Sequence, residues 1–223
     1  MRYTRYAVYY VPPEGPLAEF GASWLGWDLR LGRATPQTGI AGLDAITARP
    51  RKYGFHATLK PPFRLADGAD PARLASALAD LARTTAPARC NGLQLAVLGR
   101  FLALTPLGDP SELRRVADAC VRNLDPFRAP LTEADRARRR KGRLTARQEA
   151  LLETWGYPFV MDNFRFHMTL SGPLPGDTVA MWQEEAGRHL PPLPAPFVLD
   201  RIALCGERED GCFEMIGCHL LTG

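Results

Sequence analysis

The sequence Phe-His-Ala-Thr-Leu at residues 55–59 returns, with one change, as Phe-His-Met-Thr-Leu at residues 166–170. Both copies reach a proline at the same offset, Pro62 in the first and Pro173 in the second. Each copy is followed by signals for a helix and then for a strand hairpin, so the chain reads as two β-α-β-β units. This internal repeat predicts an α+β fold made by duplication, with two pseudo-symmetric lobes.

The alternation of the two repeated segments predicts which side chains share a face. Residues two apart in a strand lie on the same face, roughly 6–7 Å from each other. One polar face therefore carries His56, Thr58 and Lys60, and the other carries Arg165, His167, Thr169 and Ser171. The apolar residues between them are expected to face the core: Phe55, Ala57, Leu59, Phe166, Met168 and Leu170. If the pseudo-symmetry brings the strands together, both polar faces line one cleft.

Turn and capping signals divide the rest of the chain into short elements. Strands are predicted at 5–11, 53–60, 93–98, 101–104, 164–171, 197–205 and 213–221. Helices are predicted at 16–27, 70–87, 109–124, 145–156 and 178–189. Asp70-Pro71 supplies an N-cap and a first-turn proline, and Thr145 with Gln148 has the spacing of a capping box. Pro61-Pro62 is expected to stop the strand of the first motif, because proline has no N–H to donate.

Composition fits a globular protein with one bilobal domain over residues 1–223. The chain has 46% hydrophobic and 23% charged residues and a formal net charge of +4, a mild excess that suits an anionic ligand. No stretch approaches the roughly 18 apolar residues of a membrane span, and we expect a cytoplasmic location. Five cysteines form no C-x-x-C pair, which favours reduced and mostly buried thiols.

A polar interruption at residues 132–144 separates the two expected lobes, residues 1–130 with the motif at 55–60 and residues 131–223 with the motif at 166–171. Six positive charges occur within residues 135–143, from Arg136 to Arg143. Three interpretations of this cluster stay open: a solvated helix face, a site that attracts RNA or another polyanion, and a mobile lid.

Two histidines and two threonines in this pattern suit phosphodiester cleavage. The reaction needs a base for the attacking oxygen and an acid for the departing one, and imidazole titrates near neutral pH. The threonine hydroxyls would donate hydrogen bonds to the non-bridging oxygens. The predicted catalytic set is His56, Thr58, His167 and Thr169, with Lys60, Arg165 and Ser171 as candidates for substrate binding or as ordinary polar residues at strand ends. The sequence leaves open which histidine is the base.

The paired motifs resemble the signature of the two-histidine (2H) phosphoesterase superfamily, which includes bacterial RNA ligase-like proteins and cyclic phosphodiesterases. The longer strings at 52–63 and 165–170 resemble most a branch associated with bacterial phosphonate-utilisation operons. The resemblance implies a bilobal fold, each lobe an antiparallel sheet with helices outside and a central cleft between the lobes. It also implies a cytoplasmic hydrolase without cofactor or metal, acting on a cyclic phosphodiester of a small ribose-derived substrate or an RNA end. No membrane and no obligate protein partner is expected.

Other interpretations of the same residues remain. The cleft could bind a nucleotide or RNA phosphate without turnover, as a sensor. A zinc site on His56 and His167 would need a third ligand, and none stands at supportive spacing. Tyr6 and Tyr10 share a strand face and could stack on a base, although core packing is the simpler assignment. His189 and His219 lack the motif and are expected to be structural.

Overall fold

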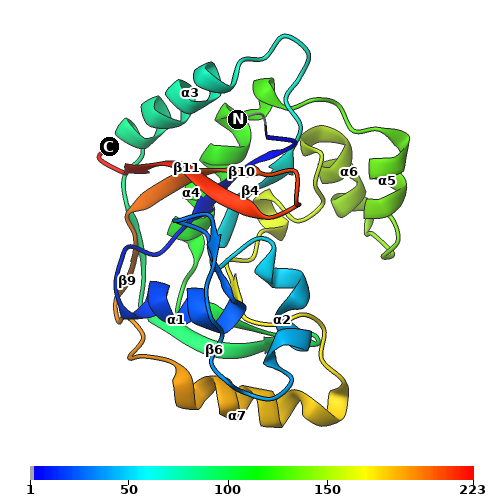
Figure 1. The fold of residues 1–223 in the computed structure, drawn as a ribbon. Helices are drawn as coiled ribbons and strands as arrows, with labels where there is room; N and C mark the ends of the chain where they lie inside the picture. The colour runs from blue at the N-terminus through cyan, green and yellow to red at the C-terminus, as the bar shows by residue number, and fades with distance from the viewer. Residues whose placement is uncertain (1–2) are drawn as a thin grey trace.

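The computed structural model describes residues 3–223 and contains a seven-stranded antiparallel sheet (Figure 1). In spatial order the strands are β11 (Phe213–Leu220), β10 (Arg201–Glu207), β1 (Tyr6–Tyr10), β4 (Ala57–Phe63), β8 (Met168–Thr169), β7 (Phe101–Leu107) and β6 (Gly92–Leu98). Two small pairs lie outside it, β2 (Trp27–Asp28) with β3 (Arg33–Ala34) and β5 (Ala88–Cys90) with β9 (Phe197–Leu199). The motif strands β4 and β8 are neighbours at the centre of the large sheet.

Four helices cover one face of this sheet. They are α1 (Pro16–Leu25), α3 (Pro71–Arg83), α4 (Ser111–Asn123) and α7 (Val179–His189), and all contribute to the same buried cluster. Helix α2 (Leu43–Arg51) packs on α1, while α5 (Glu133–Arg139) and α6 (Ala146–Trp155) project to one side (Figure 1). Short 3₁₀ turns occur at Asp125–Phe127, Met161–Asn163 and Gly176–Thr178. The predicted α+β class, with antiparallel strands and helices outside, is confirmed.

The helices begin where the local chemistry predicts. The Asp70 side chain accepts a hydrogen bond from the Ala72 N–H at the start of α3, and Thr145 and Gln148 form the expected capping box at α6. Helix α1 lies directly on the first motif because it has glycine at position 21. A Cβ there would sit 2.1 Å from the Phe55 ring, so a larger residue would push the helix away.

The strands do not sort into halves at residue 130 as the expected lobes do. Strands β10 and β11 pair beside β1 and β4, whereas β6 and β7 pair beside β8. Each half of the sheet therefore combines strands from both parts of the chain, and hydrogen bonding continues across the centre. A repeat indicates that two units are similar, but it does not indicate which unit each strand pairs with.

The motif strands also differ in length from the prediction. Strand β4 continues through Pro61-Pro62 to Phe63, which pairs with Tyr6 after a register shift, so the expected stop at the prolines is wrong. The irregular register accommodates residues that cannot donate to a ladder. Strand β8 is regular only at Met168–Thr169, much shorter than the predicted 164–171.

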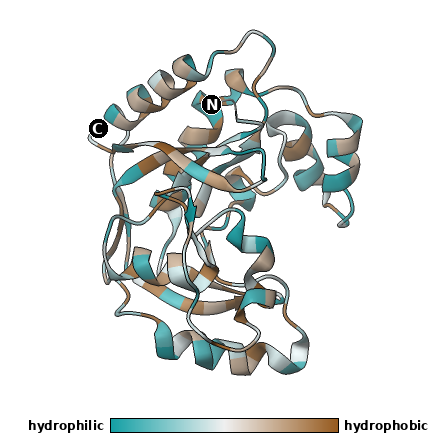
Figure 2. Cartoon of the chain, viewed as in Figure 1, coloured by the Kyte–Doolittle hydropathy of each residue, from teal (hydrophilic) through white to brown (hydrophobic). Residues whose placement is uncertain are grey.

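Most polar and exposed residues lie away from the core cluster. Helix α5 is mostly hydrophilic (Figure 2). Of the five cysteines, Cys90, Cys120 and Cys205 are buried and Cys218 is exposed. Within residues 3–223, no helix combines the length and the apolar character that crossing a bilayer requires.

Candidate active site

The register between β4 and β8 brings the two motifs side by side. Ala57 pairs with Met168, so His56 lies next to Thr169 and Thr58 lies next to His167. The two copies therefore run in opposite directions, which is the relation that a pseudo-two-fold axis produces.

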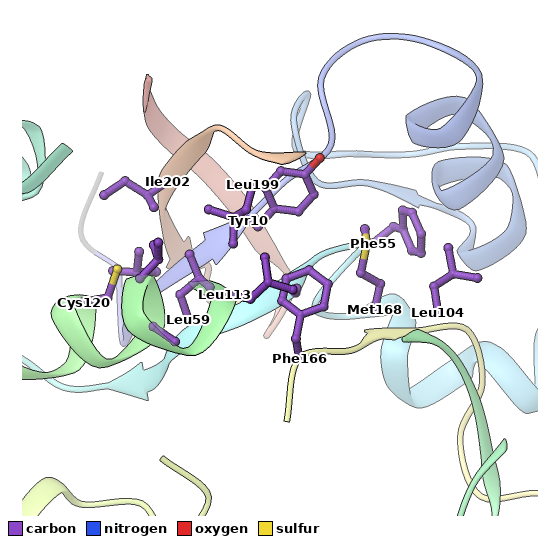
Figure 3. Packing of buried hydrophobic residues seen from close by; sticks show 14 of the residues in the cluster. Tyr10, Phe55, Leu59, Leu104, Leu113, Cys120, Phe166, Met168, Leu199 and Ile202 are labelled. Atoms are coloured by element: carbon purple, nitrogen blue, oxygen red, sulfur yellow. The ribbon is translucent and has the colours of Figure 1, made fainter. Parts of the chain in front are cut away.

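The predicted separation of the two faces is confirmed for the motif residues. Phe55, Ala57, Leu59, Phe166, Met168 and Leu170 are all buried in the main core cluster, and Figure 3 shows Phe55, Leu59, Phe166 and Met168 packed among other core side chains. His56, Thr58, His167 and Thr169 are half-buried. The face that carries these four polar residues is called the motif face below.

Both histidines are held by the same local hydrogen bond. Nδ1 of His56 lies 2.9 Å from the Gly54 carbonyl oxygen, and Nδ1 of His167 lies 2.8 Å from that of Arg165. A carbonyl oxygen only accepts, so each Nδ1 carries a proton, and in the neutral ring each Nε2 presents a lone pair. In the first copy the Thr58 hydroxyl, 3.0 Å away, donates to Nε2 of His56. The motif thus presents two neutral imidazoles whose Nε2 atoms can accept protons.

The turn before His56 depends on a glycine. Gly54 has φ +69°, and a Cβ there would lie 2.6 Å from the Leu29 side chain. This left-handed conformation suits glycine, and it positions the carbonyl oxygen that orients the His56 ring.

Tyr9 packs against the His56 ring, a contact that the sequence alone does not predict. Its ring stacks on the His56 imidazole with centroids 3.7 Å apart, and it also lies 5.9 Å from the Phe213 ring. The Tyr9 hydroxyl is fully buried without a hydrogen-bond partner among the described residues, and burial raises its pKa. Every residue of β1 is buried, so the strand shows no alternation that could have assigned Tyr9 to the motif face.

Burial makes both histidines difficult to protonate. It lowers the pKa of His56 to about 4, the Gly54 hydrogen bond opposes this in part, and His167 is close enough to lower the pKa of His56 further. Burial also lowers the pKa of His167. Two neutral imidazoles close together are the expected state at neutral pH.

This state predicts a pH-dependent stability. An unfolded histidine binds its proton near pH 6.5, whereas native His56 does so only near pH 4. Between these values the unfolded state binds more protons, so the free energy of unfolding falls as the pH falls. The slope is up to about 1.4 kcal/mol per pH unit for each histidine, measurable by urea unfolding from about pH 7 to about pH 4.5. His56→Gln should lose its share of the slope and His219→Gln should keep it; an unchanged slope in His56→Gln would contradict the buried neutral imidazole.

Lys60 does not share the motif face, and the expectation that it does is wrong. The side chain is 2% exposed, and Nζ lies 3.1 Å from the Val121 carbonyl oxygen and 3.5 Å from the Asp125 carboxylate. A register shift separates the Tyr9–Thr58 pair from the Val8–Lys60 pair. This β-bulge turns Lys60 to the core side together with Leu59.

Ser171 and Arg165 are placed differently from each other. Ser171 is 1% exposed, and its hydroxyl accepts from the Leu102 N–H and donates to the Gly172 carbonyl oxygen. It therefore secures the end of β8 to β7 instead of pointing from the motif face. Arg165 is exposed, and its side chain makes no ion pair with the residues that the structure describes.

The remaining candidates lie away from the motif face or outside the two motifs. Tyr6 and Tyr10 are 4% exposed members of the core cluster, on the opposite face from His56. His189 lies 3.2 Å from Glu185 on α7, and His219 lies on the edge strand β11. Among residues 3–223, no three His, Cys, Asp or Glu side chains lie close enough together to hold a metal ion.

Two surface pockets adjoin the first motif. One, about 160 Å³ in volume, has Phe55, Val11 and Trp27 in its wall. Val11 follows Tyr10, the partner of Ala57, so the register places it opposite His56. The other pocket includes residues 60–64 at the far end of β4. The residues of the motif face on β4 lie between them in the chain.

Two curated relatives of this chain carry the same description. A protein of Janthinobacterium sp. (strain Marseille), described as "Ribose 1,5-bisphosphate phosphokinase PhnN", is 36% identical over 219 residues, which are 93% of this chain and 48% of that protein. A protein of Laribacter hongkongensis (strain HLHK9) with the same description is 38% identical over 83% of this chain and 44% of its own length. The chain thus spans about half the length of the curated relatives it matches.

Solved structures align over almost the whole chain at low identity. A chain described as "Crystal structure of E.coli LigT complexed with 3'-AMP" aligns over 100% of both chains with 15% identity and a TM-score of 0.45. The TT0787 protein of Thermus thermophilus covers 98% of both chains with 16% identity and a TM-score of 0.46.

Residues 58–214 match the family described as "Protein of unknown function (DUF1045)". The matched segment begins at Thr58 and contains the whole second motif. Since it covers well over half of the 223 residues, this chain belongs to the DUF1045 family.

Proposed function

We propose that the chain is a metal-independent phosphoesterase of the two-histidine type, acting on a cyclic or otherwise activated phosphodiester. The observation that carries the proposal is the placement of two His-x-Thr pairs on adjacent strands, with both histidines oriented by the same hydrogen bond. One neutral Nε2 atom can take a proton from the attacking oxygen, and the other imidazole, once protonated at Nε2, can give a proton to the leaving oxygen. Thr58 and Thr169 would donate to the non-bridging oxygens.

The asymmetry between the copies favours His56 as the general base. A base must be unprotonated at neutral pH, and the pKa of His56 is lowered by burial and by the nearby His167. The anionic phosphate would raise the pKa of a neighbouring imidazole, and His167 would then hold the proton that the leaving oxygen needs. In the resting site the Thr58 hydroxyl occupies Nε2 of His56, so substrate binding would turn this hydroxyl toward phosphate.

The proposed substrate is a small ribose-derived cyclic phosphodiester, with an RNA end as the second member of the class. Phosphonate breakdown passes through a ribose cyclic phosphate, which fits the branch that the motifs resemble. The relatives described as kinases are about twice as long as this chain, and none of the three lysines here follows a glycine as in a P-loop.

The test is turnover in EDTA with 2′,3′-cyclic nucleotides, ribose cyclic phosphates and short RNAs with cyclic ends. Chelation should change the rate by less than about 2-fold, because imidazoles and hydroxyls supply all the proposed chemistry. Loss of activity in EDTA that returns with a divalent cation would contradict the mechanism. Binding without turnover of any member of the panel would favour a phosphate-binding sensor instead.

A further inference from the structure

A basic pocket lies where α5 and α6 pack on the far end of β4. Its cationic lining comes from β4, α5 and the segments next to β1, β4 and α4: Arg5, Lys60, Arg64, Arg128, Arg138 and Arg139. Asp135 holds this arrangement together, because its carboxylate accepts from Arg64 of the β4 end and from Arg138 of its own helix. Helix α5 is thus fixed over the pocket by a nearly buried carboxylate.

The pocket has more positive than negative charge. Its ion pairs are Arg5 with Glu207, Lys60 and Arg128 with Asp125, and Arg64 and Arg138 with Asp135. Six cations therefore face three carboxylates, an excess of three positive charges. Within residues 3–223, Arg139 is the member of this set without a carboxylate.

Arg139 is poised to bind an anion. Its guanidinium carbon lies 4.4 Å from the Tyr157 ring centroid, which fixes the plane of the group. Nε is buried and has no acceptor among the described residues. Burial lowers the pKa of Arg139, and the nearby cations Arg138 and Arg5 also lower it. A buried N–H without an acceptor is costly, and a phosphate oxygen is the acceptor that a guanidinium fits best.

Arg5 links the pocket to the motif face, because it lines the pocket and its guanidinium carbon lies 5.8 Å from the centroid of the Phe213 ring beside Tyr9. Arg5 directly precedes β1 and lies four residues before Tyr9, so continued alternation places both on the same side of the sheet. Tyr9 stacks on His56, and Tyr53 stacks on the Phe213 ring 5.3 Å away. This row of rings leads from the catalytic histidine toward Arg5. Arg5 and Arg139 line the same pocket, so a substrate held at His56 that extends along these rings reaches the pocket at Arg5.

We propose that Arg139 and the pocket around it bind a second phosphate group of the substrate, a monoester remote from the diester that is cleaved. The substrate class is then a ribose cyclic phosphodiester that also carries a terminal phosphate. This inference rests on the proposed function for the position of the diester. A terminal phosphate carries up to two negative charges near neutral pH, which matches the uncompensated charge of the pocket.

The test compares Arg139→Gln with Arg143→Gln, a matched control that removes the same charge. Arg143 is exposed in the same polar segment and makes no ion pair within the described chain. Each variant is assayed on a ribose cyclic phosphodiester with and without a phosphate on the 5-hydroxyl. We expect Arg139→Gln to lower kcat/KM about 10- to 100-fold for the phosphorylated substrate and less than about 3-fold for the other. Arg143→Gln should leave both values within about 2-fold of wild type.

The outcomes separate this inference from the proposed function. Equal effects of Arg139→Gln on both substrates, or no effect on either, would overturn the second phosphate site while turnover itself would still support the phosphoesterase. If only an RNA with a cyclic end responds to Arg139→Gln, the pocket binds an internal phosphate and the monoester assignment is wrong.

A binding measurement tests the phosphate site even if the protein shows no turnover. Calorimetry with ribose 5-phosphate should give a Kd for wild type that rises about 10-fold or more in Arg139→Gln and stays unchanged in Arg143→Gln. Such a result without turnover would support the phosphate site and reject the enzyme. Equal Kd values in all three proteins would reject the site.

Discussion

His56→Ala and His167→Ala are each expected to lower kcat by about 10²- to 10⁴-fold, the range that a positioned general acid or base contributes. The substrate affinity should change much less, because the two imidazoles act on protons that move in the transition state. Steady-state kinetics on the best substrate of the EDTA panel measures this. His219→Ala is the control, since it removes a histidine from the edge strand β11.

The double variant adds a sharper test of the same mechanism. If one histidine takes a proton while the other gives one in a single reaction, losing both should cost less than the product of the two single losses. Losses that multiply fully would indicate two independent roles. Alanine variants that retain wild-type kcat would exclude the motif face as the catalytic site.

The repeat was enough to predict the four central residues of the candidate site. A period of two assigns each motif residue to a face, and the core assignments of Phe55, Leu59 and Met168 are confirmed. The assignment of residues to the two faces is correct here because the strands keep regular alternation in the few residues nearest to the contact between β4 and β8.

The period of two assigns residues to the wrong face where the strands are irregular. Lys60 was assigned to the motif face, but a β-bulge shifts it to the core, and nothing in residues 57–63 marks the bulge except the prolines that follow. Ser171 lies beyond the regular part of β8, where its hydroxyl bonds to backbone. Tyr9 lies in a strand buried on both faces, so its contact with His56 depends on tertiary packing alone.

Trp24→Ala is expected to reduce the free energy of unfolding by about 3–5 kcal/mol, the cost of deleting a large buried aromatic. Trp24 is 0% exposed and packs 5.5 Å from the Phe20 ring. For a chain of this length the melting temperature should fall by roughly 6–20 °C. Urea and thermal unfolding measure the change, with the half-buried Trp155→Ala as a control that should lose less.

Trp24 also contacts the segment that carries the second motif. Its indole N–H donates to the Leu170 carbonyl oxygen at 2.9 Å, and Leu170 directly follows Thr169. Trp24→Phe keeps most of the ring volume but leaves this carbonyl without its donor, so stability should fall by only about 1–3 kcal/mol. If the bond holds β8 in register beside β4, kcat should fall with it while the protein stays folded, because a displaced Thr169 no longer meets the phosphate. Unchanged kcat in Trp24→Phe would mean that the bonds of β8 to Leu102 position the second motif without help from α1.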